Sequence, residues 1–252
     1  MRIASLVIVP MVLVTAGCFE GQRTFKVNAD GSGTIVDTVK LGEQAKGMLE
    51  GMEQMDSSTP AEKKAKKKAK YEETAAALGT GVTFVSVAPT KDGGEVTTYA
   101  FKDINTVRAV GMPNPDANSS SKEEPLTFKL AKNAAGNSVL TIVAAPRKAE
   151  EAAKKPKASP EDTAKEIAMM KGMLGGLKIK SVVEVNGLVK TSSPNVTGST
   201  VTLMAVDFDA IDAASLAKLS AAGGPPTPAQ MRGVKGVTMS DDTVTIEFTG
   251  KK

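Results

Sequence analysis

The sequence predicts an α+β fold: an antiparallel β-sheet built from successive hairpins, with inserted amphipathic helices, following a cleaved signal peptide. Short segments of alternating apolar and polar residues recur along the chain, and turn residues such as Asp30-Gly31 and Asn186-Gly187 separate them. Other stretches carry apolar residues at helical spacing. With 252 residues, of which 41% are hydrophobic and 24% charged, the chain can bury a substantial core.

Hairpins dominate the first 144 residues. Clusters of Gly, Asn and Asp between neighbouring alternating segments favour antiparallel pairing of those segments. Thr59-Pro60 places an N-cap residue before Pro at the first helical position. The expected elements are strands at 24–28 and 34–41, helices at 45–55 and 61–78, strands at 82–88 and 96–102, a loop at 112–125, and strands at 126–130 and 139–144.

The second half repeats this mixture. Residues 146–160 are rich in Lys, Glu, Ala and Pro and are expected to form a linker or an exposed helix, so a sub-boundary of the 23–252 domain would fall there. Gly175-Gly176 is expected to end the helix at 161–174. The expected elements are helices at 161–174 and 211–221, strands at 178–185 and 199–208, and a closing hairpin of 236–239 with 244–248. Six of the seven Phe fall in expected strands and are predicted to lie in the core.

The composition excludes several kinds of chemistry. The chain has no His, so it lacks an imidazole base or metal ligand. Its single Cys allows neither an intrachain disulfide nor a Cys-rich zinc site. Only nine aromatic residues and no Trp disfavour the stacking of nucleic-acid bases. We therefore expect no enzyme activity, no cofactor, no metal and no nucleic-acid partner.

Two polar groups resemble metal sites but have simpler explanations. Asn28, Asp30 and Ser32 match the spacing of a calcium loop, yet the twelfth position is Val39, where a bidentate Glu is required. A hairpin turn explains the same residues. The three Asp between 207 and 212 lie where a strand passes into a helix, and helix capping accounts for them.

The N-terminus has the features of an export signal. Arg2 precedes an apolar run over 3–14, which is too short for a comfortable membrane span. Val14-Thr15-Ala16-Gly17-Cys18 resembles the lipobox of bacterial lipoproteins, although Thr15 stands where Leu is commonest. The resemblance implies cleavage between Gly17 and Cys18, a diacylglyceryl thioether on Cys18, and usually an amide-linked acyl chain such as palmitate. Two or more chains anchor a protein stably.

The residue after the cysteine bears on location. Phe19 follows Cys18 where Asp would signal retention, so the family's sorting rule implies the outer membrane, facing the periplasm. The inner membrane and the cell surface stay open as alternatives. Strand-like sequence begins near Arg23, which leaves residues 18–22 as a short tether with a reach of roughly 15–18 Å. The domain is therefore expected to lie against the bilayer.

A basic cluster occupies the expected helix at 61–78. One interpretation is a solvated helix surface whose charge is balanced by neighbouring Glu residues. The other is a contact for anionic lipid headgroups or another anionic envelope polymer. Each Lys near such a surface would contribute about 1 kcal/mol of attraction. The Met residues of the amphipathic helices either line an adaptable apolar groove or pack against the sheet. The six cluster residues are Lys63, Lys64, Lys66, Lys67, Lys68 and Lys70.

The early hairpin over 24–41 and the helical insert after it are followed by Val182-Val183-Glu184-Val185-Asn186-Gly187 and Gly198-Ser199-Thr200-Val201-Thr202. Together these features resemble the LppM-type domain of bacterial lipoproteins. The resemblance implies an extracytoplasmic module for lipid or partner binding. We thus expect a non-catalytic binding module on a membrane-anchored envelope lipoprotein. The alternatives are a structural envelope-assembly lipoprotein and, less favoured, a hydrolase that uses only Asp, Glu, Ser and Lys.

Overall fold

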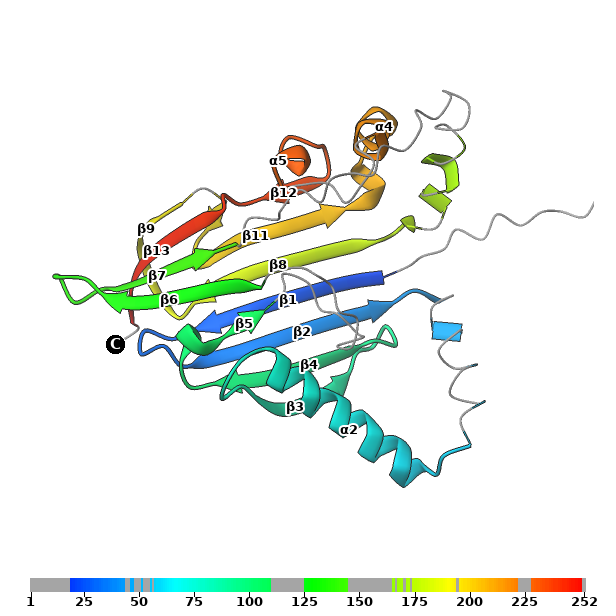
Figure 1. Ribbon diagram of the computed structural model, residues 1–252, viewed down its shortest axis with the longest axis horizontal. Coiled ribbons are helices and arrows are strands. Elements are labelled where there is room, and N and C mark those ends of the chain that lie inside the picture. The colour runs from blue at the N-terminus through cyan, green and yellow to red at the C-terminus, as the bar shows by residue number, and fades with distance from the viewer. Residues whose placement is uncertain are drawn as a thin grey trace, which may run out of the picture.

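Two β-sheets form the framework of the described part of the protein (Figure 1). The computed structural model describes residues 19–43, 46–47, 51, 55, 57–109, 125–144, 165, 167–169, 171–172, 174–193, 195–221 and 228–250. The larger sheet has the strand order β10-β11-β8-β1-β2-β4-β3, with β12 paired to β11, and the smaller has the order β5-β6-β7-β13-β9.

The bounds of the elements are as follows. The larger sheet contains β1 (Phe19–Val27), β2 (Gly33–Leu41), β3 (Thr83–Pro89), β4 (Glu95–Phe101), β8 (Lys178–Val185), β10 (Val196–Thr197), β11 (Thr200–Asp207) and β12 (Val237–Met239). The smaller sheet contains β5 (Arg108–Ala109), β6 (Leu126–Lys132), β7 (Ser138–Val143), β9 (Gly187–Ser192) and β13 (Thr243–Gly250). The helices with defined bounds are α2 (Pro60–Ala77), α4 (Ala213–Ala221), α5 (Pro228–Met231), and the 3-10 turns η1 (Ile104–Thr106) and η2 (Phe208–Ala210).

The predicted fold class, an α+β antiparallel sheet of successive hairpins with inserted helices, is wrong. Among the described residues strands outnumber helices, the strands form two separate sheets, and β1 pairs with β8 in parallel. Consecutive strands also separate: β8 and β12 belong to the larger sheet, whereas β9 and β13 belong to the smaller one. The alternation of apolar and polar residues marks where strands are. This alternation carries no information about which distant strands pair, and a prediction based on it therefore favours hairpins between neighbouring strands.

Three hairpins are nevertheless where the sequence predicts them. They are β1–β2, β3–β4 and β6–β7, each antiparallel. In the first, the turn is closed by Asp30, whose carboxylate accepts hydrogen bonds from the backbone N–H and the hydroxyl of Ser32. Short polar turns of this kind set the register of the flanking strands without help from the rest of the chain.

One apolar core joins the two sheets. Phe25 of β1 and Phe128 of β6 are both buried, with ring centroids 5.0 Å apart, and Phe248 of β13 is fully buried beside them in the same cluster. Five of the six Phe predicted for the core are buried, and Phe84 is partly buried against its margin. A separate small cluster around Phe208 packs η2 and α4 at the end of the larger sheet where β11 ends.

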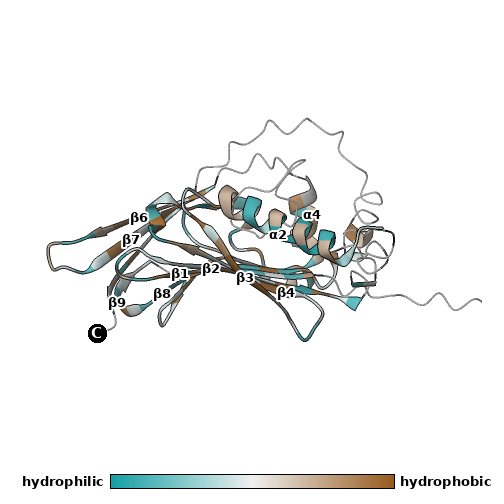
Figure 2. Ribbon diagram, turned by 90° about the horizontal axis from the view of Figure 1, so that it is seen from below, coloured by the Kyte–Doolittle hydropathy of each residue, from teal (hydrophilic) through white to brown (hydrophobic). Residues whose placement is uncertain are grey.

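Helix α2 covers part of the larger sheet. Its start is the predicted one: Pro60 is the first residue, and Thr59 and Glu62 form a reciprocal capping box. Near its end, Tyr71, Ala75 and Leu78 are buried. Figure 2 shows α2, α4 and the β6–β7 hairpin on one side of the larger sheet. We call this side the inner face and the opposite side, which carries Lys26 and Glu184, the outer face.

A row of buried polar residues crosses the inner face. Ser181, Arg23, Asp37 and Thr97 occupy the same register position on β8, β1, β2 and β4. The Arg23 guanidinium donates from Nε to Asp37 Oδ1 at 2.7 Å and from Nη2 to Oδ2 at 2.6 Å. Arg23 is 2% exposed and Asp37 is 7% exposed. This bidentate pair thus links the two strands from within the protein interior.

The two tyrosines provide a test of the packing under α2. Burial, followed by the hydrogen bond that the Tyr71 hydroxyl donates to Glu95 Oε1 at 2.6 Å, raises the pKa of Tyr71 above its ordinary value. Burial and the nearby Asp37 carboxylate raise the pKa of Tyr99 to about 12. The fold therefore favours the neutral phenols. The stability that they contribute is fully present below the ordinary Tyr pKa of about 10 and is lost as the pH rises through the folded-state values.

We expect both tyrosines to be mostly neutral in the folded protein around pH 11, whereas the urea-denatured chain should be mostly ionised there. Ultraviolet absorbance of tyrosinate measures this cleanly, because the chain has two Tyr and no Trp. Ionisation of one residue near pH 10 with the fold intact would contradict the arrangement. Tyr71→Phe identifies which residue contributes each part of the titration curve.

Candidate functional site

Strand β1 begins at Phe19, the residue directly after Cys18. The sequence predicts strand-like residues only from near Arg23, four positions later. Cys18, Gly17 and the rest of residues 1–18 lie outside the described residues, so cleavage and lipidation stay predictions. Within the described parts of the chain, no helix is long and apolar enough to cross a membrane.

Other strands of the larger sheet begin or end beside the start of β1. Phe19 pairs with Leu41, the last residue of β2, and Glu20 pairs with Lys178, the first residue of β8. Further across the sheet, Glu95 is the first residue of β4. We call this end of the larger sheet the anchor end. It is the right-hand end in Figure 1.

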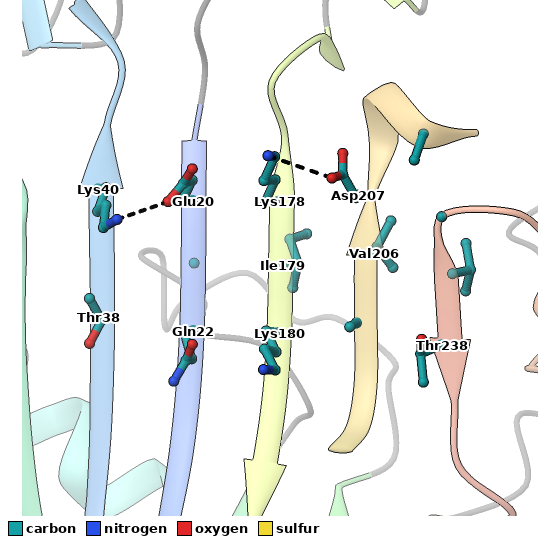
Figure 3. A pocket seen from close by; sticks show the side chains of 15 residues that line it. Glu20, Gln22, Thr38, Lys40, Lys178, Ile179, Lys180, Val206, Asp207 and Thr238 are labelled. Atoms are coloured by element: carbon teal, nitrogen blue, oxygen red, sulfur yellow. Dashed lines mark ion pairs between the residues drawn. The ribbon is translucent and has the colours of Figure 1, made fainter. Parts of the chain in front are cut away.

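The outer face at the anchor end carries a row of alternating charges. Figure 3 shows Lys40, Glu20, Lys178 and Asp207 in sequence across β2, β1, β8 and β11. Lys40 Nζ lies 3.1 Å from Glu20, and Lys178 Nζ lies 3.5 Å from Asp207. The hydrogen bond and the charge of Glu20 raise the pKa of Lys40 above its ordinary value. Since all four side chains are roughly half exposed, these pairs neutralise charge at the surface more than they stabilise the fold.

Next to this row lies a polar row with one unpaired charge. Thr38, Gln22 and Lys180 lie side by side on β2, β1 and β8, and Ala205 continues the row on β11. The Gln22 amide donates to Thr24 at 3.0 Å. Lys180 is exposed, and no carboxylate of the described residues pairs with it.

The two rows border a hollow of about 540 Å³, which we call the anchor-end groove. Its walls include Lys40, Lys178 and Asp207, and Thr238 of β12 lies on the far side. This volume is within the usual range for small-ligand sites. The groove escaped the sequence analysis because its residues come from four distant segments. Lys178 and Lys180 alternate along β8 and so lie on one strand face, which is the signal that could have indicated it.

The lysine cluster of α2 also reaches the anchor end. Lys67 Nζ lies 2.7 Å from Glu95 Oε2, and Glu95 pairs with Val39, which in turn pairs with Gly21 of β1. Of the six predicted contact residues, Lys63 is partly buried and the other five, Lys64, Lys66, Lys67, Lys68 and Lys70, are exposed. Exposed lysines fit both a solvated helix surface and a contact for anionic headgroups. The position of the cluster at the anchor end favours the second interpretation.

The other candidate residues have structural roles where they are described. Asp30 closes the β1–β2 turn, Asp209 accepts a hydrogen bond from the Gly176 N–H, and Asp212 accepts one from the Ser215 N–H at the start of α4. Among the described residues there is no group of three or more potential metal ligands.

Two of the six methionines of the expected amphipathic helices, Met55 and Met169, lie among the described residues. Met55 is 89% exposed and Met169 is 61% exposed, so neither packs against the sheet. Met48, Met52, Met170 and Met173 lie outside the described residues.

Comparison with known proteins gives little beyond this geometry. A scan against protein-family models finds no match, and a search of curated protein sequences finds none either. Among solved structures, the NMR structure of the folded domain of the Mycobacterium tuberculosis LppM protein is similar at 11% sequence identity and a TM-score of 0.30. The similarity covers 93% of this chain and 91% of that one.

Proposed function

We propose that this protein is an envelope lipoprotein, anchored through Cys18, whose folded domain is a non-catalytic binding or interaction module held at the membrane surface. One observation carries the proposal: β1 starts at Phe19, so the strand follows the predicted lipidation site without a spacer. An acylated Cys18 would bring the anchor end of the larger sheet to the level of the lipid headgroups.

The charges at the anchor end support this orientation. Lys180 of β8 and the exposed lysines of α2 lie at this end of the larger sheet, and Lys180 has no carboxylate partner among the described residues. Basic side chains near an anionic leaflet add about 1 kcal/mol each to membrane attraction. We therefore assign the lysine cluster of α2 to contact with anionic headgroups, in addition to its role as a solvated helix surface.

The carboxyl groups favour a non-catalytic role. A general acid needs a carboxyl pKa raised toward neutrality. The shifted carboxyl groups among the described residues, Asp30, Glu62, Asp212 and Glu247, all have a lowered pKa, because hydrogen-bond donors stabilise the charged form.

Phe19 after Cys18 favours sorting to the outer membrane, facing the periplasm.

The anchoring proposal predicts the mass of the mature protein. Protein extracted from membranes should lack residues 1–17 and carry three acyl chains, or at least two, on Cys18. Intact-mass analysis measures this directly. Cys18→Ala is the matched control and should keep its signal peptide and gain no acyl mass. A wild-type protein with an unmodified Cys18 in the soluble fraction would refute the anchor.

A further inference from the structure

We propose that the anchor-end groove binds the headgroup of an anionic phospholipid from the membrane that holds the protein. This inference rests on the proposed anchoring through Cys18. The groove differs from the lysine cluster of α2 in that it is a concave site on the outer face, whereas α2 covers the inner face.

The polar row supplies the charged donor that a phosphate requires. Lys180 contributes an ammonium group with no carboxylate partner in the described structure. Thr38 and Thr238 each lie two strands away from Lys180 on opposite sides, about 10 Å at the usual strand spacing, so their hydroxyl groups face the ends of a headgroup larger than its phosphate. Hydrogen bonds between an ammonium group and phosphate oxygens are about twice as strong as neutral ones. Ala205, small and on the same row, leaves room above β11 for the ligand.

The balance of charges selects the kind of anion. Glu20 and Asp207 already neutralise Lys40 and Lys178 at 3.1 and 3.5 Å. Among the groove residues that the structure describes, Lys180 therefore provides the one uncompensated positive charge. A phosphodiester carries a single negative charge and matches it. A phosphomonoester carries a charge of about −1.5 to −2 at neutral pH. Lys180 would neutralise only part of it, and the remaining negative charge would be repelled by the carboxylates of Glu20 and Asp207. The site therefore fits a glycerophospholipid diester such as phosphatidylglycerol.

The position of the groove favours a membrane lipid over a soluble ligand. Glu20 forms part of the groove wall and is the second residue after Cys18, so at most about 8 Å separates the two Cα atoms. Once Cys18 is acylated, the groove lies at the depth of the phosphates. A lipid can then enter from its own leaflet without leaving the bilayer, and the ligand is always at high local concentration.

The test uses the full lipidated chain in a nonionic detergent. Calorimetric titration with short-chain phosphatidylglycerol should give saturable binding, with weaker binding of short-chain phosphatidylcholine, whose choline group cancels the phosphate charge. Lys180→Gln should weaken phosphatidylglycerol binding about tenfold or more. The matched control is Lys26→Gln, which removes the same charge from the outer face beside Glu184, away from the groove, and should change the affinity less than about twofold.

A second variant tests shape rather than charge. Ala205→Leu fills the groove and should weaken binding by a similar factor while leaving all lysines in place. Circular dichroism confirms that each variant is folded. Equal losses for Lys180→Gln and Lys26→Gln, or equal affinity for phosphatidylcholine, would overturn the proposal.

Two further outcomes separate this inference from its premises. If glycerophosphoglycerol, the same headgroup without acyl chains, binds as tightly as the lipid, the ligand is a soluble phosphodiester and the assignment to a membrane lipid is wrong. The mass of the titrated protein reports independently whether Cys18 is acylated. Failure of the anchor and failure of the groove are therefore recorded by different measurements on one sample.

Discussion

Asp37→Ala is expected to lower the free energy of unfolding by about 3–5 kcal/mol, the usual cost of removing one partner from a buried ion pair. Arg23 would stay 2% exposed while losing the carboxylate that accepts from its Nε and Nη2. A guanidinium cannot lose its proton to escape this cost. Because the pair joins β1 to β2 in the middle of the larger sheet, the loss affects the whole fold.

Urea denaturation followed by circular dichroism measures this effect, since the chain has no Trp for fluorescence. The control is Glu184→Ala, which removes an exposed partner 3.9 Å from Lys26 and should cost less than about 1 kcal/mol. A double variant with Arg23→Met and Asp37→Leu should recover most of the lost stability, because it removes both charges. A cost for Asp37→Ala no larger than that of the control would show that the pair is not coupled to folding.

The second large effect concerns membrane affinity. In the chain that starts at Phe19 and carries no lipid, replacing four exposed lysines of α2 by Gln should weaken binding to vesicles containing phosphatidylglycerol by at least about a hundredfold. Each lysine at an anionic surface contributes about 1 kcal/mol. The four are Lys64, Lys66, Lys68 and Lys70, which leaves the Lys67–Glu95 pair and the partly buried Lys63 intact.

Vesicle sedimentation measures this affinity, and the result has two checks. A control variant with Lys26, Lys102, Lys129 and Lys132 replaced by Gln makes the same change in net charge away from α2, and should weaken binding less than tenfold. Raising the salt concentration toward 1 M shortens the screening length to about 3 Å and should abolish most of the wild-type binding. Equal losses in both variants would mean that net charge, rather than α2, controls the attraction.

Two local motifs could be predicted from local sequence. The β1–β2 turn and the start of α2, with Thr59 as N-cap and Pro60 as the first residue, depend on residues within a few positions of one another, and both are where they were expected. The parallel pairing of β1 with β8 joins residues such as Phe25 and Val183, more than 150 positions apart, and no periodicity encodes it. The assumption of one hairpin sheet failed at this point.

The candidate site divides in the same way. Cys18 and the α2 lysines stand out along the chain because they occur in a processing motif and in a single helix. The groove does not, because Gln22, Lys180 and Ala205 become neighbours only when β1, β8 and β11 pair. Nor did the sequence show that Phe19 is already in a strand, which is the feature on which the orientation of the domain depends.

The central place of β1 has a mechanical consequence. Any pull on the lipid would be transmitted along β1, which is held by nine residue pairs with β2 and eight with β8. Such a force would load both hydrogen-bonded ladders in shear, so many bonds would have to break together. An edge strand such as β3 would instead peel away one bond at a time. The strand that follows the predicted anchor is therefore among the hardest in the sheet to extract by tension.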